Sequence, residues 1–174
     1  MISLKQSINA AKGGMLVALT LLTLYLARFI PTNKLTFLVI SSVFVPMGIL
    51  SLNITQGTII YVASSLLSFF LGLNSISILY IFIFGPYGII KFLVEKIKNP
   101  FIEIILKLLY FNAATAILYM ISKELILINI STELHFLPLV LLLQFLYLIY
   151  DYSLTILIGY IQKRLFKQYN KNKL

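Results

Sequence analysis

The chain has 174 residues, of which 60% are apolar and only 11% charged, and its mean hydropathy is +1.00. A soluble domain carries about a quarter charged residues, so water is not the main solvent of this chain. The length allows about six membrane-spanning helices of about 20 residues, without a folded soluble domain in addition. The absence of cysteine excludes disulfides, thiolate metal sites and cysteine nucleophiles.

Apolar segments separated by short polar breaks predict an all-α polytopic fold with six transmembrane helices in one membrane domain. In chain order they cover residues 13–30, 35–52, 57–73, 76–94, 101–122 and 136–162. Proline, glycine and asparagine mark the breaks. The third and fourth helices are so close that they must form a tight hairpin. The apolar run 125–130 is too short to cross and is expected to lie along the interface or pack under the last helix.

The first apolar segment differs from a cleaved signal peptide. Lys5 and Lys12 precede it, but no small-residue cleavage site follows, so we expect a retained helix.

The distribution of basic residues predicts the orientation. Lysine and arginine in short loops are retained on the cytoplasmic side. Of the 14 basic residues, all but Arg28, Lys34 and Lys123 fall at the helix ends that lie on the side of the two termini. We therefore predict cytoplasmic N- and C-termini in a bacterial plasma (inner) membrane, and we interpret the net charge of +9 as a topology signal rather than a nucleic-acid surface.

Motifs for catalysis are missing. The sequence has no G-x-x-x-x-G-K-[ST], H-E-x-x-H, G-x-S-x-G or S-x-x-K motif. The single histidine, His135, makes no conventional zinc site and is expected to be solvated in an outer loop. The sequence thus favours a protein that is not an enzyme, has no cofactor or metal and does not hydrolyse ATP by itself.

A ladder of small residues begins the first helix. Ala10, Gly14 and Ala18 follow one another at four-residue spacing and so share one helix face. In lipid, helices associate largely through close packing over such small side chains. This face is expected to accept another helix, either of this chain or of a partner protein.

An aspartate in the last helix is the most unusual residue of the sequence. Asp151 lies 12 residues before Lys163, about 18 Å along a helix and near the middle of the bilayer. An ionisable group there is costly, so it must face the bundle interior. Its face includes Gln144, with Tyr147 beside it. The sequence leaves two interpretations open: one wall of a polar cavity, or a single interhelical contact, for example with Lys107.

Aromatic residues form a stripe on the fourth predicted helix. Tyr80, Phe84 and Tyr87 recur at helical spacing, and Gly85-Pro86 interrupts the helix, where proline should produce a kink. The stripe could hold a flat ligand or could simply pack.

Polar residues also mark one face of the fifth predicted helix, where Asn112 lies in the outer half. Glu103 and Lys107, at i and i+4, are expected to form a structural pair, and Lys91 and Glu95 a similar one. The sequence therefore predicts a cavity open to the outside among the last three helices. The loop 31–34, with Lys34 and the nearby Arg28, could cover it.

The length, six helices, cytoplasmic termini and Ala10/Gly14/Ala18 ladder resemble the S components of energy-coupling factor (ECF) transporters, which capture vitamins and related micronutrients. The resemblance implies that the ladder docks a transmembrane coupling subunit, that separate ATPase subunits supply energy, and that the first outer loop is a lid. It implies a small-molecule site at the residues Asp151, Gln144, Tyr147, Asn112, Tyr80, Phe84, Tyr87, Arg28 and Lys34. Asp151 would favour a cationic or donor-rich substrate, Arg28 and Lys34 an anionic one.

Two other classes stay open. One is a structural multi-pass subunit of a larger complex, for example for cell-wall synthesis, which binds no ligand and has Asp151 buried in a helix contact. The other is a membrane enzyme acting on lipid, which the missing catalytic residues disfavour.

Overall fold

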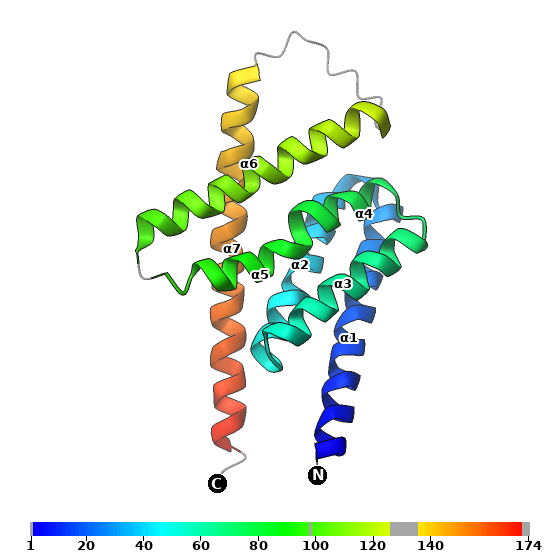
Figure 1. The fold of residues 1–174 in the computed structure, drawn as a ribbon, viewed down its shortest axis with the longest axis vertical. Coiled ribbons are helices and arrows are strands. Elements are labelled where there is room, and N and C mark those ends of the chain that lie inside the picture. Colours follow the sequence, from blue (N-terminus) through cyan, green and yellow to red (C-terminus); the bar gives the residue numbers. More distant parts are fainter. Residues whose placement is uncertain (1, 98, 126–135, 172–174) are drawn as a thin grey trace.

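The computed structural model describes residues 2–97, 99–125 and 136–171, and the regular elements of these ranges are all helices (Figure 1). The elements are α1 (Ile2–Phe29), η1 (Pro31–Asn33), α2 (Lys34–Ser51), α3 (Ile54–Phe70), α4 (Ser75–Leu79), the π-helical η2 (Tyr80–Phe84), α5 (Gly85–Val94), α6 (Pro100–Leu125) and α7 (Phe136–Lys171). The expectations for His135 and for residues 126–130 of the apolar run lie outside the described residues.

Among the described residues, five segments are long and apolar enough to cross a bilayer, as expected of a multi-pass membrane protein. They are Gln6–Phe29, Lys34–Ser51, Ser75–Val94, Pro100–Ile121 and Leu141–Lys163. α3 is a shorter apolar helix of 17 residues, about 25 Å long, and falls short of a hydrocarbon core about 30 Å thick. The all-helical class is therefore confirmed, whereas the sixth crossing stays a prediction.

The outermost helices extend beyond their predicted bounds. α1 begins at Ile2 rather than at residue 13, and α7 continues to Lys171 rather than ending at 162. Hydropathy marks only the part of a helix that suits lipid, while the backbone hydrogen bonds continue into polar residues without a breaker. α3 begins three residues early because the side chain of Asn53 caps it, accepting a hydrogen bond from the Gln56 amide at 2.8 Å.

The helices fall into two directions (Figure 1). α1 and α7 run along the long axis of the molecule, and the first residues of α1 and the last of α7 lie at the same end. The α5–α6 hairpin crosses α7 at a steep angle. Termini at one end agree with the predicted topology, but which side of a membrane they face stays a prediction.

Close approach of backbones joins α2 and α3. A Cβ atom added at Gly57 would lie 2.3 Å from Ile49 Cγ1 and 3.2 Å from the Ile49 amide nitrogen. One added at Gly48 would lie 2.4 Å from Ile60 Cδ1. These glycines therefore allow α2 and α3 to touch, and the core between the two helices is built on Val45, Ile49 and Ile60.

The predicted hairpin between the third and fourth helices is present. Gly72 has a φ of +68°, which glycine adopts without strain, and the chain turns directly into α4. The predicted interruption at Gly85-Pro86 is also present, and it takes the form of the π-helical segment η2.

Candidate functional site: a charge network between three helices

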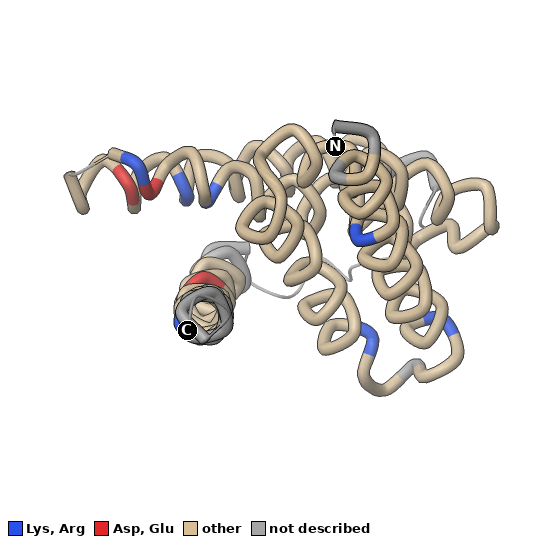
Figure 2. Tube along the Cα trace, turned by 90° about the horizontal axis from the view of Figure 1, so that it is seen from below, with Lys and Arg blue, Asp and Glu red and all other residues tan. Residues whose placement is uncertain are grey.

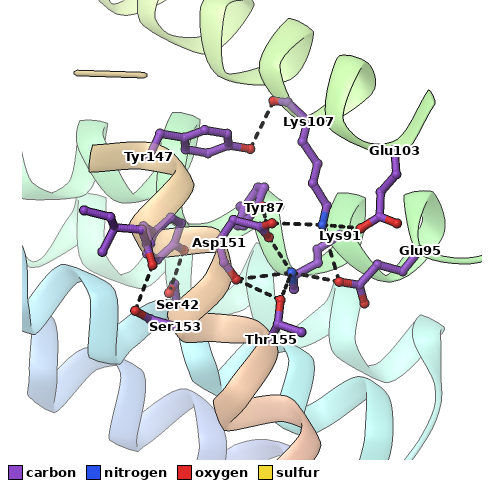
Figure 3. Close-up of polar contacts among 12 residues, drawn as sticks. Ser42, Tyr87, Lys91, Glu95, Glu103, Lys107, Tyr147, Asp151, Ser153 and Thr155 are labelled. Carbon is purple, nitrogen blue, oxygen red and sulfur yellow. Dashed lines mark hydrogen bonds and ion pairs between the residues drawn. The ribbon is translucent and has the colours of Figure 1, made fainter. Parts of the chain in front are cut away.

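The carboxylate of Asp151 on α7 lies between two lysines, one on α5 and one on α6 (Figure 3). Lys107 Nζ is 3.0 Å from Asp151 Oδ2. Lys91 Nζ donates to Asp151 Oδ1, as does the hydroxyl of Tyr87. Both carboxylate oxygens thus have partners on neighbouring helices.

Two glutamates complete the network on the far side of the lysines (Figure 3). Lys107 Nζ is 2.6 Å from Glu103 Oε1, and Lys91 Nζ is 2.8 Å from Glu95 Oε1. Glu95 also lies 3.4 Å from Lys107. The predicted i, i+4 pairs are therefore present, but they belong to a larger charge network, which we define as Lys91, Glu95, Glu103, Lys107 and Asp151. When all five groups are charged, it has one excess negative charge.

Helical spacing explains how the sequence builds this network. On α5, Tyr87, Lys91 and Glu95 follow one another at four-residue intervals and form one row. On α7 the row is Tyr147, Asp151 and Thr155, and the Thr155 hydroxyl accepts a hydrogen bond from Lys91 at 2.8 Å. A third row on α6 starts with Glu103 and Lys107. The fold brings the three rows together, and Figure 2 shows acidic positions near the tip of the α5–α6 hairpin and on α7.

The two signs of charge differ in exposure. The side chains of Lys91 and Lys107 are 0% and 5% exposed. Those of Asp151, Glu103 and Glu95 are 18%, 27% and 33% exposed. Because the ammonium groups are enclosed and each carboxylate is partly exposed, the accessible groups of the network are its carboxylates.

Aromatic rings close the other side of the network. The Tyr147 ring stacks on Phe111 of α6 with centroids 4.3 Å apart, and its hydroxyl donates to the Lys107 carbonyl at 3.0 Å. Tyr87 is fully buried and packs against Tyr147 and Tyr150. These contacts hold the backbone of α6 and α7 around the charges.

The structure brings three of the predicted substrate-binding residues together: Asp151, Tyr147 and Tyr87. Gln144 is half-buried on the same helix, about one turn from Tyr147. Asn112 is exposed and donates to the Leu108 carbonyl of its own helix at 2.9 Å, so it is occupied away from the network.

The remaining aromatic residues of the predicted stripe lie in the protein core. Tyr80 and Phe84 are buried with Leu24 and Leu38 of α1 and α2. The Tyr80 hydroxyl is 2.9 Å from that of Ser64. Their contacts are with this chain, which favours the packing interpretation of that part of the stripe.

The predicted lid residues lie apart from the network. Arg28 donates to the Gly72 carbonyl and thereby ties the end of α1 to the turn before α4. Lys34 is exposed at the start of α2.

The small-residue ladder faces away from the rest of the described chain. Ala10, Gly14 and Ala18 are exposed, and a Cβ added at Gly14 would meet nothing within 4 Å. The adjacent Gly13 is buried and faces α3, where its added Cβ would lie 3.8 Å from Gln56 Oε1. The open alternative of a partner helix within this chain is thus not realised among the described residues.

Sequence reasoning missed the contact between Lys91 and Asp151. A usable signal existed, because Lys91 lies within a predicted span and a buried lysine needs a counter-charge. The chain has only five acidic residues, so the choice of partners was small.

An apolar groove of about 720 Å³ lies on a different surface from the predicted cavity. It is formed by α3 and α5, without residues of α6 or α7, and Ile59, Val62 and Leu93 are among its lining residues. Among the described residues, no group of histidine, aspartate or glutamate side chains is arranged to hold a metal ion.

No protein-family model, curated protein or solved structure matches this chain.

Proposed function

We propose that the chain is a substrate-capturing membrane subunit for uptake of a vitamin-like small molecule, and that this molecule carries a positive charge. The observation that carries the proposal is the difference in exposure between the two signs of charge in the network. Both lysines are enclosed there, whereas all three carboxylates remain partly exposed.

The number of charges supports a role beyond helix packing. An ionisable side chain near the bilayer centre, where Asp151 is predicted to lie, costs about 2.5–3.5 kcal/mol on insertion scales, so such a group is by default a hypothesis for a functional site. One aspartate and one lysine would be enough for a structural contact. Five charged groups with one excess negative charge would instead accommodate a cationic ligand, which would balance the charge and leave both lysines paired.

The placement of the remaining predicted residues supports a cation rather than an anion. Arg28, a candidate for binding an anionic group, is engaged with the Gly72 carbonyl. Lys34 lies at the surface.

Transport itself would require partners. In this proposal the exposed face of Ala10, Gly14 and Ala18 docks a transmembrane coupling subunit, because small side chains allow close approach of a helix in lipid. Separate ATPase subunits would supply energy, since the sequence has no nucleotide-binding loop. This arrangement is that of the ECF S components that the sequence resembles.

The test is ligand binding by the purified chain in lipid nanodiscs. Small molecules retained from the cells are identified by mass spectrometry, and a panel of cationic, neutral and anionic vitamins is screened by thermal shift. A ligand at 100 times its Kd stabilises the folded state by about 2.7 kcal/mol, so cationic members should raise the Tm. If nothing is retained and no compound changes the Tm, the chain binds no such ligand.

Glu95→Gln is the sharpest variant for this test. It removes the excess negative charge. Lys91 remains paired with Asp151, and Lys107 remains paired with Glu103 and Asp151. We expect it to weaken binding of the cationic compound at least tenfold with little change in the Tm of the unliganded protein. Asn112→Leu, at a predicted site residue outside the network, is the matched control and should bind normally.

A structural subunit without a ligand is the second candidate. The burial of Tyr80 and Phe84 within the chain favours it, because that part of the stripe has no free face for a ligand. In this case the charge network fixes helix contacts only. Glu95→Gln would then change neither binding nor uptake of any compound, while disruption of the α1 face would still release a partner protein.

A further inference from the structure

The break between α4 and α5 leaves backbone carbonyls without helical donors. In η2 the amide of Gly85 reaches back five residues to the carbonyl of Tyr80. The next residue, Pro86, has no amide hydrogen to offer the following carbonyls, those of Ile81 and Phe82. Inside a membrane such groups need another partner within the protein.

Two tyrosines from different helices supply these donors. The hydroxyl of Tyr61 on α3 donates to the Ile81 carbonyl at 3.0 Å. The hydroxyl of Tyr110 on α6 donates to the Phe82 carbonyl at 2.6 Å and also lies 3.1 Å from that of Ile83. The break is therefore held from both sides.

Glycine at position 85 is part of the same arrangement. A Cβ atom there would lie 2.6 Å from two ring carbons of Tyr61 and 3.0 Å from the Tyr80 carbonyl oxygen. The ring can reach its position only because no side chain occupies that space.

Both segments that flank the break are packed, α5 against Pro46 of α2 at Gly88, but only the segment after the break carries charge. Before it, Ile76 and Tyr80 are packed into the core with Leu24. After it, α5 carries Tyr87 and Lys91 to Asp151. Tyr110 links the two sides directly, because its ring stacks on Tyr87 with centroids 6.0 Å apart.

We propose that η2 is a hinge, and that Tyr61 and Tyr110 are positioning residues whose hydroxyls hold it closed. Release of these hydrogen bonds lets α5 swing and withdraws Tyr87 and Lys91 from Asp151, which opens the charge network. π-Helical segments within helices frequently occur at functional sites. The ligand that would enter the opened network rests on the proposed function, whereas the hinge does not.

The first part of the test measures the position of α5 without any ligand. Because the sequence contains no cysteine, spin labels can be attached to cysteines introduced at Leu93 on α5 and Leu157 on α7, both exposed. Distances are measured by electron paramagnetic resonance in nanodiscs. The parent protein should give a single distance between the two labels. Tyr110→Phe and Tyr61→Phe should each give a second distance in addition to it. The exposed Tyr152→Phe is the control and should leave the distance unchanged.

The second part restores the missing donor. Pro86→Ala returns an amide hydrogen to the break, so the tyrosine hydroxyls should become dispensable. The added distance should be lost when Tyr110→Phe is combined with Pro86→Ala. The hinge is wrong if both tyrosine variants keep the parent distance, or if Pro86→Ala leaves the added distance in place. Should one tyrosine variant fail to fold, the other carries the test. A protein that binds no cation but shows these distances would refute only the proposed function.

Discussion

The first three helices and the last three are held together by different forces. α2 and α3 meet through glycines that let backbones touch, namely Gly48 and Gly57, and Gly13 of α1 faces α3. α5, α6 and α7 meet through the charge network and its tyrosines. The membrane-spanning parts of α6 and α7 are each 17% buried within the described chain, against 39% for α2 and 44% for the segment that contains α5.

Polar side chains also serve different purposes in the two regions. In the first three helices, most buried hydroxyls return to their own backbone, as Thr20 does to the Leu16 carbonyl and Ser41 to the Leu38 carbonyl, although Ser64 also contacts Tyr80. In the last three helices, the charged groups and the hydroxyls of Tyr87 and Tyr147 bond across helices. Lipid offers no hydrophobic drive for helix association, so contact requires either close packing or polar bonds. Close packing predominates in the first region, and polar contacts between helices predominate in the second.

Of the variants proposed, Lys91→Met should lower the free energy of unfolding most, because it disrupts the charge network that joins α5, α6 and α7. Lys91 is fully enclosed and contacts Asp151, Glu95 and Thr155. Its removal leaves one lysine facing three carboxylates. Breaking a buried ion pair in this way costs about 3–5 kcal/mol. The free energy of unfolding in nanodiscs or detergent, titrated with a denaturing detergent, is the measurement.

Lys12→Met is the matched control for this prediction, because Lys12 is exposed on α1. It should change the free energy of unfolding by less than about 0.5 kcal/mol. If Lys91→Met costs no more than about 1 kcal/mol, as an exposed ion pair does, the charge network does not hold the second region together.

Gly57→Ala should weaken the first region by an intermediate amount. The added methyl group meets Ile49 at both its side chain and its backbone, so α2 and α3 must separate. Overpacking of this kind costs about 1–3 kcal/mol. Gly159→Ala on α7 makes the same chemical change where nothing lies within 4 Å, and should not destabilise. Equal effects of the two variants on thermal unfolding would show that close approach is not what stabilises α2 against α3.

The sequence predicts the features that depend on neighbouring residues. Helix class, the hairpin before α4 and the break at Gly85-Pro86 follow from local composition, and so do the pairs four residues apart, such as Glu103 with Lys107. Asp151 was recognised because a charge in an apolar segment is costly wherever the helix packs.

Features that depend on which helices adjoin could not be predicted in this way. Lys91 and Asp151 are 60 residues apart, and only the crossing of α5 and α7 brings them together. The same holds for Tyr80 and Phe84, whose helical spacing fits a ligand wall and a packed core equally well. The small-residue ladder also does not predict which face of α1 is exposed. Gly13 and Gly14 are adjacent, and only their packing in the fold distinguishes them.

Gly14→Leu should have the smallest effect on the fold and so extends the comparison beyond the chain. The leucine enters open space on α1, so the free energy of unfolding of the isolated protein should change by less than about 0.5 kcal/mol. Association with a partner membrane protein should nevertheless be lost, because a bulky side chain prevents a helix from approaching closely. Co-purification from native membranes measures this association. Leu22→Ala changes another exposed residue of the same helix and leaves the small-residue ladder as it is, so it serves as the control. Partners that still co-purify with Gly14→Leu would leave the small-residue ladder as a lipid-facing surface, and close packing would then operate only inside the chain.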